Sequence, residues 1–165
     1  MNADAERLAG EFEAANDEVI AFVEACPDER WTSMVGGEDW PVGVVVHHIA
    51  VGHRQMLDWL RRASGGHEIT TSAAQIDADN ARHARHFAGV TRAATVEELR
   101  SHGAALGRFI RGLSSDELAT SVAFGPGDGS EVTTRQLASV AARHCRTHLA
   151  DARPSGRVRG HLTGH

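Results

Sequence analysis

The sequence lacks lysine and tyrosine altogether, and only two of its 165 residues are cysteine. All 17 basic residues are therefore arginine, and the 22 acidic residues leave a formal net charge of −5. A nucleic-acid-binding protein normally carries a basic surplus, so this balance argues against nucleic acid as a partner. No apolar run approaches the ~20 residues needed to cross a bilayer, which argues against a membrane protein.

The first residues of the chain and its two cysteines indicate the cellular compartment of the protein. The stretch MNADAERLAGEFEAANDEV is polar and acidic, whereas a signal peptide is basic and then apolar. Cys26 and Cys145 lie far apart in the sequence, and two such cysteines form no disulfide framework. We therefore expect a cytoplasmic protein with two free thiols.

Apolar residues recur at helical spacing through most of the chain. Over residues 3–25, for example, Leu8, Phe12 and Val19 fall on one face of a helix. Further helices are expected from Pro41 to about Ala63, over 73–90 as a weaker candidate, from Thr95 to Leu113, and from Thr133 onward. The segments TVEE and TTRQ match the capping box at the start of the last two, and SSDE predicts one further short turn.

The same pattern predicts the fold class. No strand signal of useful length appears, so we expect an all-α protein, a four-helix bundle with an extra short helix. Residues 1–152 would form this single domain. Residues 153–165 are polar and rich in glycine, and we expect them to form a flexible C-terminal tail.

Eleven histidines are unusual for this length and are the only compositional sign of metal or proton chemistry. His144 and His148 are four positions apart, so they differ by only about 40° around a helix and continue its apolar stripe. Buried imidazoles need partners for their ring nitrogens, and a shared divalent metal is one such partner. The alternative is that one ring is a hydrogen-bonded core residue and the other lies at a wet edge.

A metal site needs a third ligand, and the spacing alone does not select it. On the second helix, His47 falls on the polar side and is expected to be solvated, whereas His53 lies within the apolar stripe. His48 lies at the edge of the stripe, with Gly52 one turn on leaving space beside it. His102 lies on the core side of its helix and is another candidate for the third ligand. His83 and His86 are expected on the surface.

Two segments together resemble the DinB/YfiT-like superfamily of metal-dependent proteins. They are DWPVGVVVHHIAVGHRQM and, far downstream, RHCRTHLADAR. In that family a tryptophan opens the second helix, a histidine follows eight residues later, and a His-x-x-x-His pair lies on the last helix of a four-helix bundle. Trp40 plus eight is His48, so the resemblance, which covers roughly residues 5–152, implies a metal site made of His48, His144 and His148.

The resemblance also implies a chemistry. Three neutral imidazoles leave a metal with its full charge and with open positions, where a bound water has a pKa near 7 or a thiol is held as thiolate. Zinc or nickel fits such ligands best, and iron is also possible. Family members include the mycothiol-dependent maleylpyruvate isomerase and bacillithiol transferases, which implies a low-molecular-weight thiol as co-substrate.

Two functions follow as hypotheses. The first is a metal-dependent enzyme, either a thiol-dependent transferase or a hydrolase, that acts on a small-molecule substrate. The second is a non-catalytic bundle, a binding or stress-associated protein whose metal site is structural or vacant. A structural zinc site normally has four protein ligands, so a site with three favours the enzyme, unless His53 is a fourth. In either case we expect a homodimer.

Overall fold

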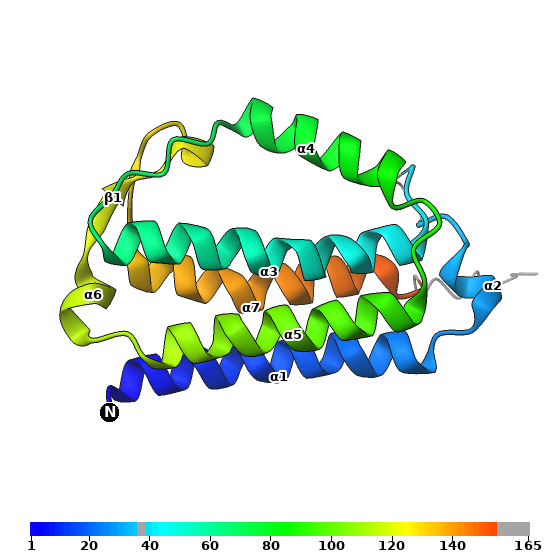
Figure 1. The fold of residues 1–165 in the computed structure, drawn as a ribbon, viewed down its shortest axis with the longest axis horizontal. Helices are drawn as coiled ribbons and strands as arrows, with labels where there is room; N and C mark the ends of the chain where they lie inside the picture. The colour runs from blue at the N-terminus through cyan, green and yellow to red at the C-terminus, as the bar shows by residue number, and fades with distance from the viewer. Residues whose placement is uncertain (36–38, 155–165) are drawn as a thin grey trace, which may run out of the picture.

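Four long helices form the bundle in the computed structural model, which describes residues 1–35 and 39–154. They are α1 (Ala3–Ala25), α3 (Val42–Ser64), α5 (Arg92–Arg111) and α7 (Thr134–Ala152). Figure 1 shows α1 and α7 running in one direction and α3 and α5 in the other. Both α1 and α3 pack on α5 and α7, so α1 and α3 occupy opposite corners of the bundle. The predicted all-α four-helix bundle is confirmed.

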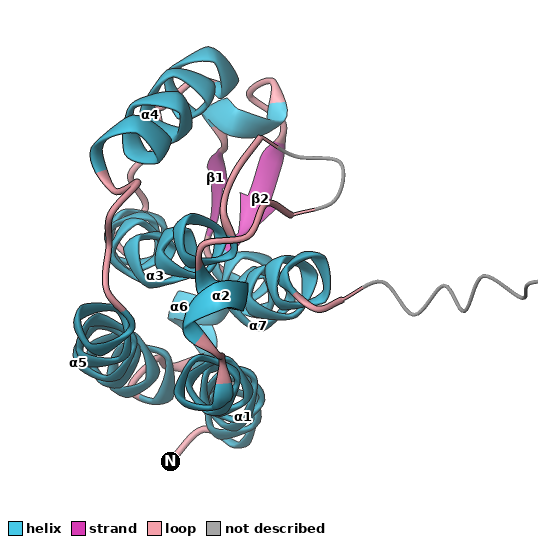
Figure 2. Cartoon of the chain, turned by 90° about the vertical axis from the view of Figure 1, so that its right-hand side faces the viewer, coloured by secondary structure: helices cyan, strands magenta, loops and turns pink. Residues whose placement is uncertain are grey.

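Shorter elements lie in the connections. They are α2 (Asp28–Trp31), α4 (Ala73–His86), α6 (Ser115–Ala119), β1 (Ser121–Ala123), the 3-10 turn η1 (Gly125–Gly127) and β2 (Glu131–Thr133). Figure 2 shows α4 outside the bundle, where it lies over α3. The two strands pair antiparallel with Val122 opposite Val132. They are three residues each, too short for the alternation that identifies a strand in a sequence.

Capping residues set the helix starts, and one start differs from the prediction. Ser114 and Thr133 each form a capping box at the heads of α6 and α7, as expected. Thr95 does not begin a helix, because α5 already starts at Arg92 and is capped by Thr91. The Thr95 side chain is instead buried, and its hydroxyl donates to the carbonyl of Thr91 at 2.8 Å.

The core between the four long helices consists mainly of aliphatic side chains, joined by Phe12, Trp31, Met56 and the two cysteines. Helix α3 contributes an unbroken buried segment, from Val42 through His47, because α4 covers the side that the bundle leaves open. No helix in the described part of the chain is long and apolar enough to cross a membrane. Most of the predicted C-terminal tail, residues 155–165, lies outside the described residues.

Candidate metal centre

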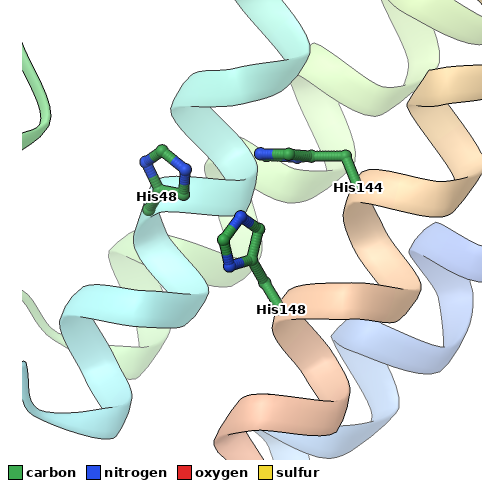
Figure 3. Close-up of side chains that lie close together, drawn as sticks. All are labelled: His48, His144 and His148. Atoms are coloured by element: carbon green, nitrogen blue, oxygen red, sulfur yellow. The ribbon is translucent and has the colours of Figure 1, made fainter. Parts of the chain in front are cut away.

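Three histidine side chains from two neighbouring helices meet at one side of the bundle. His48 comes from α3, and His144 and His148 come from successive turns of α7. Figure 3 shows His144 and His148 reaching from α7 toward α3, which carries His48. One ring nitrogen of each lies within 4.8 Å of the others, and the ring centroids are 4.6, 4.8 and 5.2 Å apart. The structure thus brings together the three residues that the resemblance singled out.

The ring of His144 lies where α3 has no side chain. A β-carbon at Gly52 would lie only 2.6 Å from Cε1 of His144. The space that the sequence predicted beside Gly52 is present, and the imidazole of His144 occupies it. The glycine lets α3 and α7 approach closely enough for His144 to reach His48.

The surroundings keep the imidazoles in the form that binds metals. Burial lowers the pKa of His48 to about 3, and the rings of His144 and His148 lower it further. Burial likewise lowers the pKa of His144 to about 3, with His148 the next cause. Both rings are therefore neutral near pH 7 and present a nitrogen lone pair. Asp151 places a carboxylate oxygen 3.7 Å from Nδ1 of His148, which is longer than a hydrogen bond.

The structure corrects the prediction for His47, which was expected on a solvated face. Its side chain is fully buried, because α4 covers this side of α3. Its Nδ1 lies 2.8 Å from Nε2 of His83, and its Nε2 lies 3.1 Å from a carboxylate oxygen of Glu98. His83 was expected on the surface and is buried in the same contact, whereas His86 is exposed as expected.

One signal in the sequence could have revealed this burial. The run from Val42 to Val46 contains no polar residue, which is typical of a helix buried all round and not of one with a solvated face. Nothing comparable in the sequence points to Glu98, which lies 51 residues away and meets His47 only because α5 packs on α3.

The other candidate ligands have different partners. His53 is buried as predicted, and its Nε2 bonds to Oδ1 of Asn16 at 2.8 Å. The Asn16 amide in turn donates to the carbonyl of Leu99 at 3.0 Å. His102 Nδ1 lies 3.0 Å from the carbonyl of Ala50. Neither histidine joins the cluster of three.

The two cysteines are free and buried, as expected. Burial raises the pKa of the Cys145 thiol to about 12, and burial also raises the pKa of Cys26. A thiol that holds its proton this strongly is a poor nucleophile at neutral pH. Cys145 therefore acts as a packed core residue next to the site.

A cavity of about 270 Å³ opens beside the three rings. Besides His48, His53, His144 and His148, its described lining consists of apolar or uncharged polar residues, namely Gly52, Gln55, Met56, Trp59, Ile76, Asn80, Val140 and Ala141. A larger groove, of about 1090 Å³, runs along α1 and α5 and has no histidine among its described lining residues. The smaller cavity is lined by all three histidines of the cluster, and a neighbouring cavity of about 460 Å³, whose described lining includes Asp58 and Asp79, also reaches His48.

The comparisons with known proteins agree with the fold and identify the family. A family model described as the DinB superfamily matches residues 11–152. No curated protein matches the sequence. Among solved structures, the chain is similar to YfiT from Bacillus subtilis, described as a probable metal-dependent hydrolase with an unusual four-helix bundle topology. The TM-score is 0.74 at 14% identity, over 92% of this chain and 86% of that one. The match to the family model spans most of the chain, and this protein belongs to the DinB superfamily.

Proposed function

We propose that the protein is a metal-dependent hydrolase in which His48, His144 and His148 hold one divalent ion. The observation that carries the proposal is the gathering of three ring nitrogens within 4.8 Å of one another, next to a cavity. Two of the rings have a pKa near 3, so protons do not compete for them at neutral pH. YfiT, whose fold this chain shares, is described as a probable metal-dependent hydrolase.

The donor set fits an open site. Imidazole nitrogens suit zinc, nickel or iron, with zinc or nickel the best match. Among the described residues, the cluster contains three ligands and no fourth, whereas structural zinc sites are normally closed by four. His53, the residue that could have closed the site, is engaged with Asn16. When bound, such an ion keeps its charge and open positions, and it activates a water or a thiol placed there.

The residues of the cavity would bind and orient a small-molecule substrate. Met56, Trp59 and Ile76 provide an apolar surface, and Gln55 and Asn80 provide amide groups that can donate or accept hydrogen bonds. Because the described lining contains no charged Asp, Glu, Lys or Arg side chain, the part of the substrate that enters should be uncharged. Apolar walls also exclude bulk water, which strengthens electrostatic interactions inside the site.

The same lining favours a second candidate, a transferase that uses a low-molecular-weight thiol. No carboxylate lies among the described cavity residues, so a water there would have no carboxylate as general base. An ion held by His48, His144 and His148 would lower the pKa of a water only to about 7 but would hold a thiol as thiolate outright, with the thiol proton released to solvent.

One preparation tests both reactions. The protein is stripped of metal, reloaded with zinc, nickel or cobalt, and assayed for hydrolysis of 4-nitrophenyl acetate. We expect turnover that requires the metal and is lost in His144→Ala. The cobalt form is then titrated with dithiothreitol, and a thiolate-to-cobalt charge-transfer band would favour the transferase. Metal-independent turnover, equal in His144→Ala, would contradict the hydrolase proposal.

A further inference from the structure

A chain of three buried or half-buried side chains ends beside the metal centre without taking part in it. Glu98 on α5 bonds to Nε2 of His47, and Nδ1 of His47 bonds to Nε2 of His83 on α4. The two imidazole planes are only 6° apart, so the lone pair of one ring can face the N–H of the other. The chain therefore links three helices at the outer side of α3.

Glu98 determines which ring nitrogens of His47 and His83 carry protons. A carboxylate only accepts hydrogen bonds, so Nε2 of His47 donates to Glu98. Because neutral imidazole carries one proton, Nδ1 of His47 is then the acceptor, and Nε2 of His83 donates to it. A neutral imidazole carries one proton, and that of His83 lies on Nε2. Its Nδ1 consequently bears a lone pair.

This lone pair has no partner. His83 Nδ1 is buried from solvent and makes no hydrogen bond, in a side chain that is only 8% exposed. An unsatisfied buried acceptor costs about 1–3 kcal/mol, and native structures seldom keep one without a reason. The surroundings of the His83 ring indicate which group could donate a hydrogen bond to Nδ1.

The nearest ring of the metal centre is that of His48. The centroids of His48 and His83 are 5.8 Å apart, against 5.1 Å for the hydrogen-bonded pair of His47 and His83. The indole of Trp40 packs against both rings, at 5.7 Å from His48 and 6.1 Å from His83. The centroids of His48 and His83 are thus 0.7 Å farther apart than those of the hydrogen-bonded pair, with their ring planes at 65°.

We propose that His83 is a positioning residue whose Nδ1 accepts a hydrogen bond from the ring nitrogen of His48 that does not bind the metal. The inference rests on the proposed metal site. A neutral imidazole that ligates a metal through one nitrogen carries its proton on the other, and that N–H is almost always given to a nearby acceptor. His83 supplies this acceptor, and Glu98, through His47, holds it in the required tautomer.

The decisive comparison is between His83→Asn and His83→Leu. Both variants leave Nδ1 of His47 without its partner, but the amide oxygen of asparagine takes nearly the place of Nδ1, whereas leucine has no acceptor. We expect His83→Leu to weaken zinc and cobalt binding by about 10- to 100-fold, and His83→Asn to restore most of it. The matched control is His86→Ala, an exposed histidine on the same helix, which should bind like the wild type. Equal affinity in His83→Leu and the wild type would overturn the inference.

A second measurement needs no variant, in case His83→Leu does not fold. In the zinc-loaded wild-type protein, ¹⁵N NMR should detect a scalar coupling across the hydrogen bond between a ring nitrogen of His48 and Nδ1 of His83. A zinc-loaded protein with the His48 N–H exposed to exchange and no coupling would refute the role of His83 alone. A wild-type protein that binds no metal would refute the proposed function as well, so the two failures are distinguishable.

Discussion

The imidazole of His144 lies against the backbone of Gly52, so close that a β-carbon at position 52 would be 2.6 Å from Cε1 of the ring. One ligand of the proposed site thus depends on the absence of a side chain on the neighbouring helix. A contact of 2.6 Å is shorter than real β-carbons tolerate, so any larger residue would have to displace the ring.

Gly52→Ala should weaken metal binding while changing the stability of the fold little. Displacing the ring by overpacking costs about 1–3 kcal/mol, and every 1.4 kcal/mol is about tenfold in affinity. We therefore expect metal affinity, measured by competition with a chromophoric chelator, to fall by about 5- to 150-fold. Alanine at a helical glycine returns up to about 1 kcal/mol of helix stability, so the melting temperature should change little.

The control for this substitution is Gly10→Ala on α1, where nothing lies within 4 Å of the added carbon. It should gain the same helix stability and leave metal affinity unchanged. Normal metal binding in Gly52→Ala would show that metal binding does not require the present position of the His144 ring.

Acid should unfold the metal-free protein through its buried histidines. Burial lowers the pKa of His53 to about 3 and that of His83 to about 4, from an ordinary value of 6.5. Below pH 6.5 the unfolded chain binds protons that the folded chain does not, so stability is present above pH 6.5 and is lost as the pH falls toward 3–4. Each such histidine contributes a slope of about 1.4 kcal/mol per pH unit.

Urea unfolding between pH 7 and pH 4.5 measures this slope. His53→Gln should reduce it by about 1.4 kcal/mol per pH unit, whereas substitution of the exposed His67 by glutamine should leave it as in the wild type. A flat stability profile over this range would mean that the buried rings are already solvated.

His47→Ala should damage stability more than metal stoichiometry. The variant empties a fully buried site and removes the partner of both Glu98 and His83. Losses of this kind typically amount to about 2–4 kcal/mol, which calorimetry can detect. The three clustered histidines remain, so the folded variant should still bind one ion per chain. Loss of the ion with no loss of stability would instead make His47 a ligand.

The sequence was sufficient for the bundle because helical periodicity and capping signals are local. Residues 3–25 form α1 as predicted, and the capping box at Thr133 begins α7. The start of α5 was missed because Thr91 and Thr95 are both plausible caps, and only the fold decides between them. The paired strands escaped prediction because three residues carry almost no periodic signal.

For the site, the pair His144 and His148 could be found from spacing, but the choice of His48 depended on the resemblance. Periodicity misplaced His47 and His83, since it assumes one buried face per helix and α4 buries a second face of α3. The contact between Gly52 and His144 joins residues 92 positions apart, which no local pattern can reveal. The thiol co-substrate, the homodimer and the cytoplasmic location remain predictions.

Metal content is the most direct test of the central claim. The purified protein, dialysed against zinc, nickel or cobalt and analysed by inductively coupled plasma mass spectrometry, should contain about one ion per chain, as expected for a single three-histidine site. His48→Ala, His144→Ala and His148→Ala should each empty the site at micromolar metal, while His86→Ala stays loaded. Unchanged metal content in the three variants, or none in the wild-type protein, would contradict the account.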